Sequence, residues 1–538
     1  MNRFSLYYHT VRNMKASQIF NRLRIKLGWA CPLGVTPDDN ITNIKNVETP
    51  ESLDFDPVFL ARFPAEELMG NRITILHSSK SFDWKSRWEF GDKSALWNFN
   101  LHYFEYLFPL VKAWKDTGDR RYLDKTVEII SGWIRSNPTG VQPGWASYPA
   151  SLRIVNWISY FGYVGEALPE NFRKEFLRSL HAQFVYLSRH LEKDILGNHY
   201  FENLKSLVLA ALFFNDGPVL KKALRDFKAE CKEEILPDGM HFELSPMYHK
   251  IIFEGVLRVA AALRGAGKPD FEIESYLQPM LDAAFSFEDG LERVPLFNDG
   301  GNNVAKSLDA LTAAARKHFG ITPRFKGKLE SAGFYIFVKM VGGHQWKLIV
   351  DAGQPGPKYI PGHTHCDAMS FELFIDGRPI LVNCGTYAYQ CNNRDFFRGT
   401  AAHNTVMADG VEQSQCWGIF RLAKRSRTRV IEVDDQGICM EMIDQKGRRI
   451  IRQITVSDNV TVTDDAEGRI LKSYLHFLSQ PDQRKETVYC EELKIQWSKG
   501  ADSELLEHKY AEDFGMVEDC KVLVLTDSHT IAIQMHAR

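Results

Sequence analysis

The chain has 538 residues, and its 66 Lys and Arg against 68 Asp and Glu leave a formal net charge of −2. This length exceeds the size at which one hydrophobic core usually stops growing, so two domains are expected. Hydrophobic residues at 44% and charged residues at 25% exclude a disordered or fibrous chain. The near-neutral balance excludes the global basic field of a nonspecific nucleic-acid binder, so an anionic ligand has to meet a local patch.

The termini and the cysteines indicate the compartment. The nine cysteines are scattered, odd in number and without a CxxC pair, so no disulfide framework is expected. The first twenty residues contain no apolar signal segment, and no window has the length of a membrane span. We therefore expect a cytoplasmic protein from the sequence as given, or a periplasmic one if the chain was processed or trimmed. The oligomeric state is left open.

Residues 1–60 are predicted to form a helix and an extended lead-in. Apolar residues recur three or four apart from about Lys15 to Leu27, with Arg and Lys on the other face. Residues 31–60 are rich in Pro, Asp and Asn and show little periodicity, which is typical of an extended connection.

Residues 61–328 are predicted to be an all-helical domain. Apolar residues three or four apart predict helices, for example over 101–114, 122–135, 152–163, 172–191, 204–214 and 251–263. Breakers such as Asn137-Pro138 and Pro143-Gly144 separate them. Such antiparallel hairpins either close, completely or incompletely, into an α/α toroid or stay an open solenoid, and periodicity alone does not distinguish the two.

Residues 329–538 are predicted to be an antiparallel β-sandwich. Helical spacing ends near Gly333, and short alternating runs follow, for example over 334–338, 346–350, 370–375, 405–408 and 449–456. Asp376-Gly377 and Asp409-Gly410 are strong hairpin-turn signals. Many short strands separated by turns are the pattern of a sandwich.

Two polar clusters lie in the helical part. Asn198 stands in Gly197-Asn198-His199, just before an apolar helix, where it either faces a ligand or caps a helix end. Tyr248 stands in Ser245-Pro246-Met247-Tyr248-His249. Pro246 should make Ser245 extended and begin a helix, so Tyr248 falls in the first turn. There it either points into a cleft or packs its ring with the hydroxyl in water.

A third cluster leads into the β region. His363 and His365 are two residues apart in an apparently extended segment, so we expect them to point to opposite faces and not to share one role. One would face a cleft and the other would face inward. An inward His365 with His403 and an oxygen donor near Asn383 would make a site that suits zinc. The alternative is a pair of buried, hydrogen-bonded histidines.

These clusters, with helices before strands, resemble the heparinase II/III superfamily of polysaccharide lyases, especially its heparinase III branch. The resemblance covers most of the chain, and the matching motifs are Gly-Asn-His at 197–199, Ser-Pro-Met-Tyr-His at 245–249, His-Thr-His-Cys-Asp-Ala-Met-Ser-Phe at 363–371 and Ala-His-Asn-Thr-Val at 402–406. It implies an N-terminal α/α toroid, a C-terminal β-sandwich and a substrate groove between them.

The resemblance also implies roles for individual residues. Asn198 would neutralise a uronate carboxylate, Tyr248 would be the acid and base, and His363 an assisting base. It places His102 and Arg153 at the groove, and the full set of expected substrate-binding residues is His102, Arg153, His199, Asn203, Glu243 and Arg398. Relatives that bind a metal use His, Asp and His, which fall near His365, Asn383 and His403. In this chain Asn383 stands where those relatives have an Asp. The elimination itself requires no cofactor, so the only bound ion expected is a structural zinc or calcium ion.

The residue types fit a β-elimination. Removing the C5 proton of a uronic acid builds negative charge beside a carboxylate, so that carboxylate has to be neutralised or hydrogen-bonded first. A base removes the proton, and an acid protonates the glycosidic oxygen that leaves C4. A phenol can serve as the acid, and also as the base in a syn elimination of glucuronate. An imidazole is the better base for anti elimination of iduronate, because its pKa is near neutrality.

The expected substrate is therefore an acidic polysaccharide, either a heparan-sulfate-like glycosaminoglycan or a bacterial exopolysaccharide, left with a 4,5-unsaturated uronate end. One alternative is a glycoside hydrolase of the α/α-toroid type, which needs two carboxyl groups that Glu243 and Asp299 would supply. The other is a non-catalytic polysaccharide-binding or assembly protein.

Overall fold

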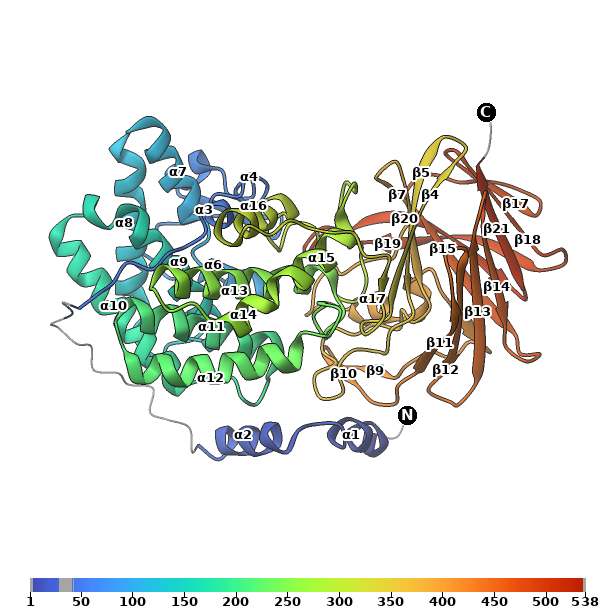
Figure 1. Ribbon diagram of the computed structural model, residues 1–538, viewed down its shortest axis with the longest axis horizontal. Coiled ribbons are helices and arrows are strands. Elements are labelled where there is room, and N and C mark those ends of the chain that lie inside the picture. The colour runs from blue at the N-terminus through green and yellow to red at the C-terminus, as the bar shows by residue number, and fades with distance from the viewer. Residues whose placement is uncertain (1–2, 29–40, 42, 536–538) are drawn as a thin grey trace.

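The computed structural model describes residues 3–28, 41 and 43–535. Helices fill the N-terminal part, and antiparallel sheets fill the C-terminal part (Figure 1). The prediction of a helical domain followed by an antiparallel β-sandwich is thus confirmed. In the described ranges, no helix combines the length and the apolar character needed to cross a membrane.

The helical domain is an array of helices that pack as antiparallel neighbours. Its helices are α3 (Glu51–Asp54), α4 (Pro57–Leu60), α5 (Ala65–Met69), α6 (Ala95–Leu101), α7 (Leu107–Thr117), α8 (Arg120–Ser136), α9 (Ser147–Val164), α10 (Glu170–Arg189), α11 (Gly197–Phe213), α12 (Gly217–Glu234), α13 (Pro246–Gly265), α14 (Phe271–Ser275), α15 (Leu277–Glu288) and α16 (Leu308–Phe319). Helix α11 is buried almost all round and packs against α9, α12 and α13. Helix α16 packs against α3, which brings the end of the array back to its beginning.

Two differences from the predicted helices concern the beginning of this domain. The helix expected over 101–114 is broken into α6 and α7, and Phe104 between them has a positive φ of 67° that a helix cannot continue through. Within the connection expected over 31–60, residues 31–40 and 42 lie outside the described residues, and α3 and α4 occupy its last part.

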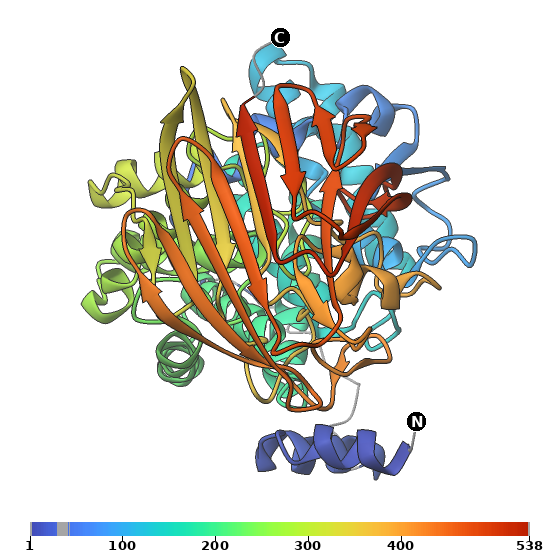
Figure 2. The same ribbon diagram turned by 90° about the vertical axis from the view of Figure 1, so that its right-hand side faces the viewer.

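Two N-terminal helices lie along the outside of the molecule, α1 (Arg3–Val11) and α2 (Ala16–Lys26) (Figures 1 and 2). Helix α2 is the predicted amphipathic helix, whereas α1 was not predicted. The side-chain amide of Gln18 donates a 3.0 Å hydrogen bond to the Ile195 carbonyl, which ties α2 to the helical domain. The apolar side of α2 is not packed, since Phe20 is 63% exposed and Leu23 is 52% exposed.

The second domain is a sandwich of two antiparallel sheets. Its strands are β3 (Lys328–Leu329), β4 (Phe334–Val341), β5 (His344–Asp351), β6 (Phe371–Ile375), β7 (Arg378–Leu381), β8 (Val406–Ala408), β11 (Arg427–Val433), β12 (Gly437–Ile443), β13 (Arg449–Val456), β14 (Val460–Asp465), β15 (Leu471–Phe477), β16 (Asp482–Arg484), β17 (Thr487–Cys490), β18 (Leu493–Trp497), β19 (Asp502–Tyr510), β20 (Glu518–Thr526) and β21 (Thr530–Met535). One sheet has the order β19-β20-β15-β7-β6-β5-β4-β3, with β8 also paired to β15. The other has the order β11-β12-β13-β14-β21-β18-β17-β16.

The core of the sandwich lies between these sheets, and Trp346, Phe371 and Leu475 of the first sheet meet Ile454 and Val462 of the second there. Buried and more exposed residues alternate along β13 and β14 of the second sheet, whereas β5, β6 and β15 of the first sheet are buried on both faces. The opposite face of the nine-stranded sheet is covered by loops, by α17 (Arg394–Arg398) and by the 3₁₀ turn η2 (Thr400–Ala402).

The two predicted hairpin turns have different outcomes. Asp376 and Gly377 do connect the paired strands β6 and β7. The hairpin expected at Asp409 and Gly410 is wrong, because β8 pairs with β15 and not with the strand that follows it. Two small hairpins, β1 (Arg72–Ile75) with β2 (Ser78–Ser81) and β9 (Cys416–Trp417) with β10 (Arg421–Leu422), lie outside the sandwich sheets.

Candidate functional site

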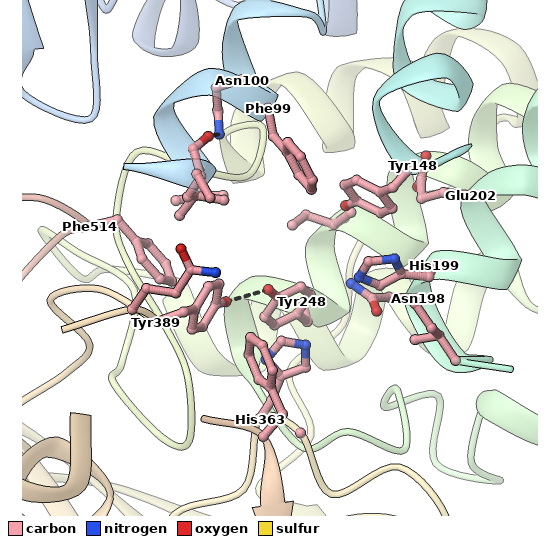
Figure 3. Close-up of a pocket in the computed structure, with 18 of the residues that line it drawn as sticks. Phe99, Asn100, Tyr148, Asn198, His199, Glu202, Tyr248, His363, Tyr389 and Phe514 are labelled. Carbon is pink, nitrogen blue, oxygen red and sulfur yellow. Dashed lines mark hydrogen bonds between the residues drawn. The ribbon is translucent and has the colours of Figure 1, made fainter. Parts of the chain in front are cut away.

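A cavity of about 1250 Å³ opens between the helical domain and the sandwich loops. Asn198, His199, Tyr248 and His363 line it, although they come from segments far apart in the sequence (Figure 3). The N-terminal helices α1 and α2 contribute to its rim. A groove between a helical and a β domain is therefore present, and it contains the three residues expected to carry chemistry.

Tyr248 is held by the beginning of α13. Ser245 is extended, with φ −105° and ψ 125°, Pro246 occupies the first turn, and the Ser245 hydroxyl accepts a hydrogen bond from the Tyr248 backbone N–H. This local geometry is the one predicted from the proline. The Tyr248 hydroxyl lies 2.6 Å from the Tyr389 hydroxyl. Burial, together with the neighbouring Tyr389 and nearby carboxylates, raises the pKa of Tyr248 well above its ordinary value.

Asn198 lies in the first turn of α11, so it begins that helix and does not end one. The chain enters α11 through Leu196 and Gly197, whose φ values are 68° and 56°. A Cβ atom on Gly197 would lie 2.7 Å from Oε1 of Glu243, so the glycine permits close packing as well as the positive φ. The tight entry places the Asn198 amide at the cavity wall, where its side chain is 3% exposed.

His363 is oriented by Asp299. Its Nδ1 lies 2.9 Å from Oδ2 of Asp299, and its Nε2 lies 3.5 Å from Oε2 of Glu243. The imidazole also packs on the Tyr248 ring, with 4.0 Å between the ring centroids and 32° between the planes. Carboxylates therefore face both ring nitrogens, and the closer contact, with Asp299, sets the orientation of the imidazole.

Asp299 is the centre of a buried polar network. Its two oxygens meet Nε2 of His365 at 2.9 Å, the Thr386 hydroxyl at 3.1 Å and the guanidinium of Arg394, with one bond at 2.7 Å. Burial alone would raise the pKa of Asp299, but Arg394 and the two histidines outweigh it and hold this pKa well below its ordinary value. Asp299 is therefore a carboxylate anion that organises its surroundings.

The expectation that His363 and His365 point to opposite faces is wrong. Residues 361–370 form an irregular loop without strand pairing, so the alternation of a strand does not apply. Both rings reach the same carboxylate, one on each oxygen of Asp299. His363 remains 11% exposed at the cavity, whereas the side chain of His365 is fully buried behind it.

Two of the expected substrate-binding residues line or adjoin the cavity. His199 lines it, with Nδ1 3.0 Å from Oε1 of Glu192 and its ring 4.5 Å from that of Tyr148. Glu243 lies behind the cavity wall, 1% exposed, and both of its carboxylate oxygens are without a hydrogen-bond partner among the described residues. Glu243 adjoins Gly197 and His363, so it lies behind the part of the cavity wall that Asn198 and the His363 imidazole form.

Four other expected residues lie within the protein and not at the cavity surface. His102 is fully buried and accepts a 2.9 Å hydrogen bond from the indole of Trp133. Arg153 is equally buried, stacks 4.0 Å above the Trp133 ring and donates to the Gln183 side chain. Burial lowers the pKa of Arg153 to about 9 and that of His102 to about 3. Both residues lie inside the helical array.

Asn203 and Arg398 hold segments of the chain in place. The Asn203 amide donates to Ser151 and to Glu192, the carboxylate that also holds His199. Arg398 is fully buried, and its guanidinium donates to the Thr364 carbonyl and to carbonyls of residues 418–421. Each of these residues positions a neighbour of the cavity and does not itself face it.

The residues expected to hold a metal lie together but form an incomplete set. The ring centroids of His365 and His403 are 5.3 Å apart. Nδ1 of His365 and both ring nitrogens of His403 lack a hydrogen-bond partner among the described residues. Asn383 adjoins this place, but its oxygen accepts the Asn404 backbone N–H at 3.0 Å. Two imidazoles fit a metal, while the amide supplies no anionic ligand. The metal at these residues stays a prediction.

Two functional positions were not nominated from the sequence. Tyr389 forms the hydrogen bond with Tyr248, and Arg394 forms the ion pair with Asp299. Both lie in the segment 385–394, which is rich in turn-forming and polar residues and has no periodicity. The only local signal was the Arg and Tyr content of a loop directly after the third polar cluster, and loops of that kind carry function more often than core segments do.

The comparisons with known proteins agree with this arrangement. The family model described as heparinase II/III N-terminus matches residues 1–326, and the one described as heparinase II/III-like, C-terminal, matches residues 322–447. The chain belongs to the heparinase II/III family. Among relatives in this family, the heparin-sulfate lyase of Pedobacter heparinus is 28% identical over 365 residues, which are 61% of this chain and 54% of that protein.

Further members extend the comparison. The heparin-sulfate lyase of Bacteroides thetaiotaomicron is 23% identical over 471 residues, 77% of this chain and 66% of that protein. The matches thus span roughly half to two thirds of the relatives' lengths. A crystal structure of heparinase III superposes with a TM-score of 0.72 at 17% identity, covering 92% of this chain and 88% of the other. The incomplete α/α toroid followed by a β-sandwich is the shared fold.

Proposed function

We propose that this protein is a polysaccharide lyase that cleaves a uronic-acid-containing polysaccharide by β-elimination and leaves a 4,5-unsaturated uronate end. The observation that carries the proposal is the meeting of an amide, a phenol and an imidazole, Asn198, Tyr248 and His363, at one cavity. The relatives named heparin-sulfate lyases support a heparan-sulfate-like glycosaminoglycan as the substrate class.

The amide of Asn198 is suited to the first requirement of the reaction. Its N–H groups can donate to the uronate carboxylate from the cavity wall. Such donation withdraws charge from the carboxylate and stabilises the carbanion that forms when the neighbouring C5 loses its proton. An amide does this without adding a positive charge that would need its own partner inside the protein.

Tyr248 is suited to be the general acid. Its raised pKa keeps the phenol protonated at neutral pH, so it can donate to the glycosidic oxygen as the C4–O bond breaks. The phenolate formed would then accept a hydrogen bond from the Tyr389 hydroxyl, which lies 2.6 Å away. The same raised pKa opposes deprotonation of Tyr248 before the reaction, which counts against its service as the base.

His363 is suited to be the general base. In the neutral ring with its proton on Nδ1, directed at Asp299, the lone pair on Nε2 can take the C5 proton. The Asp299 anion then stabilises the imidazolium that results. In this assignment the proton removed from C5 ends on His363, and the proton given to the leaving oxygen comes from Tyr248.

A glycoside hydrolase is less well supported. Hydrolysis needs two carboxyl groups that flank the scissile bond. Asp299 is fully buried in its ion pair with Arg394, and Glu243 lies 1% exposed beside His363. Neither carboxylate lines the cavity, so the two do not flank a glycosidic bond bound there.

Absorbance of the unsaturated uronate product in the ultraviolet tests the proposal. The enzyme is assayed on heparan sulfate, hyaluronan, chondroitin and bacterial uronate polymers. We expect absorbance to rise with at least one polymer, and Tyr248→Phe and Asn198→Ala to abolish turnover while the circular dichroism spectrum and the melting temperature stay near those of the wild type. Tyr276→Phe, a matched change outside the cavity lining, should retain full activity.

The outcomes separate the three functions. Near-normal rates in Tyr248→Phe or Asn198→Ala would contradict the lyase assignment. Reducing ends without ultraviolet absorbance would indicate hydrolysis, and retained glycan binding without cleavage would indicate a binding protein. If His363→Ala loses activity on iduronate but keeps it on glucuronate, Tyr248 performs both proton transfers on glucuronate and the base assignment holds for iduronate alone.

A further inference from the structure

A second group of titratable side chains lies on the outer face of the nine-stranded sheet, away from the sandwich core. His508 on β19 pairs directly with Cys520 on β20, and His476 on β15 pairs with Val522, two residues along from Cys520. Because alternate residues of a strand share one face, the three side chains are neighbours. Cys384 reaches them from the loop after β7, and none of these four residues lines the cavity described above.

We propose that Cys384, His476 and His508 bind a zinc ion, with Cys520 as the fourth ligand. The ligand atoms of the first three lie within 4.8 Å of one another, and Nε2 of His476 is 3.3 Å from Nδ1 of His508. Zinc takes imidazole nitrogens at about 2.0–2.1 Å in a tetrahedron, which places two such nitrogens roughly 3.3–3.4 Å apart. The observed separation of the two nitrogens therefore matches the edge of a zinc tetrahedron.

The fourth ligand follows from the contact between the two thiols. Cys520 interacts with Cys384 but stands outside the group of three whose ligand atoms all lie within 4.8 Å of one another, and both cysteines are buried, at 3% and 0% exposure. Two cysteines and two histidines form a closed set of the kind found in structural zinc sites. Two thiolates also balance the charge of the ion, so the buried site would carry no net charge.

Both ring nitrogens of His476 face an oxygen atom, so one of them faces an acceptor without a proton to donate. Asn404 has a fixed orientation, because its amide nitrogen donates to the Phe371 carbonyl and its oxygen accepts the His476 backbone N–H. That oxygen lies 3.2 Å from Nδ1 of His476, and the Ala401 carbonyl lies 3.0 Å from Nε2. A neutral imidazole carries one proton and cannot donate to both oxygens.

Zinc resolves this conflict. With the proton on Nδ1, directed at Asn404, the Nε2 lone pair can bind a metal on the side of His508, and the Ala401 carbonyl then faces a cation and not a lone pair. A hydrogen-bond acceptor on the second nitrogen is the usual partner of a metal-binding histidine, since it sets the tautomer and the ring orientation.

The ion would anchor the segment that carries Tyr389. The Cys384 carbonyl accepts a hydrogen bond from the Ala511 backbone N–H at 2.8 Å, and the chain then runs to Tyr389 at the cavity. A metal bond at Cys384 fixes the beginning of this segment to β15, β19 and β20. This consequence for catalysis rests on the proposed lyase function, whereas zinc binding does not.

Metal analysis of the full-length protein, purified under reducing conditions, tests the site. We expect stoichiometric zinc, which Cys384→Ser and His508→Gln lose. Cys439→Ser is the matched control, because this half-buried thiol lies on β12 of the other sheet. Zinc should also remain in His365→Gln, which separates this site from the metal predicted at His365, Asn383 and His403.

Cobalt substitution supplies a readout that does not depend on activity. The folded protein with cobalt in place of zinc should show the visible bands of tetrahedral cobalt and a thiolate-to-cobalt charge-transfer band. Cys384→Ser should lose the charge-transfer band. If His508→Gln does not fold, the wild-type cobalt spectrum still decides.

Three results would overturn the proposal. They are a reduced, folded protein that takes up neither metal, a Cys384–Cys520 disulfide that persists under reducing conditions, and zinc that is lost from His365→Gln but kept by Cys384→Ser. If stoichiometric zinc is found but no polymer is cleaved, the proposed function fails while the zinc site stands.

Discussion

Replacing Asp299 by Asn removes the charge at the centre of the network beside the cavity. The carboxylate meets Arg394, His363, His365 and Thr386 at once, and it is fully buried. An asparagine of the same shape keeps one oxygen acceptor, but its NH₂ group would face donors on the other side. The Arg394 guanidinium, 3% exposed, would be left as a buried cation without its anion.

The structure sets the size of both effects. Removing one partner of a buried ion pair costs about 3–5 kcal/mol of unfolding free energy, and neither group is exposed enough for solvent screening to reduce this. His363 also loses a charge-assisted hydrogen bond worth about 1.5–3 kcal/mol, so kcat should fall roughly 10- to 100-fold in the molecules that stay folded.

A second buried ion pair supplies the matched control. Arg452 and Asp464, each 1% exposed in the sandwich, are joined by bonds of 2.7 and 2.8 Å. Asp464→Asn should destabilise the protein to a similar extent and leave kcat unchanged, because this pair does not line the cavity. Urea unfolding measures stability, and initial rates of absorbance at saturating polymer measure kcat.

The sign of the pH dependence gives a further check. Since the folded-state pKa of Asp299 is below its unfolded value of about 3.9, its contribution to stability is complete above that pH. The contribution is lost as the pH falls through the folded-state pKa. The stability gap between wild type and Asp299→Asn should therefore be constant near neutrality and narrow below about pH 4. A gap under about 1 kcal/mol at pH 7, or one that widens in acid, would refute this account.

Three smaller perturbations test other parts of the site. Tyr389→Phe removes the hydrogen bond to Tyr248, worth about 0.5–1.5 kcal/mol, so kcat should fall roughly 2- to 10-fold with an unchanged melting temperature, and an unchanged kcat would contradict this. Gly197→Ala should lower both kcat and stability, because the positive φ and the 2.7 Å approach to Glu243 force a shift of the backbone. Arg153→Met should change the melting temperature but not KM, since this arginine is buried within the helical domain, and a raised KM would place it at the substrate instead.

Local rules predicted some of the site well. The Ser-Pro signal placed Tyr248 in a first helical turn, since a proline constrains the residue before it and begins a helix whatever the rest of the fold does. By contrast, the beginning of α11 was predicted at 204, although the helix begins at Gly197. The polar residues of its first turn conceal the apolar periodicity there, so Asn198 was expected just before the helix and not within its first turn.

The contacts of Asp299 show what short-range patterns do not contain. Its partners His363, His365 and Arg394 lie 64, 66 and 95 residues away in the sequence. Asn298-Asp299-Gly300 is an ordinary turn signal, and no periodicity reveals that the side chain in such a turn meets a guanidinium and two imidazoles from distant segments. The strand rule then misassigned the two histidines because the loop that carries them is irregular.

The geometry of the proposed reaction depends on a contact between the domains. Tyr248 is positioned by α13 in the helical domain, whereas His363 and Tyr389 come from loops of the sandwich. The 2.6 Å bond between the two tyrosines and the 4.0 Å packing of Tyr248 on His363 both cross that boundary. A movement of one domain by even an ångström would break the hydrogen bond before it disturbed either fold. Mild substitutions that loosen the sandwich loops should therefore reduce turnover even where they leave the melting temperature unchanged.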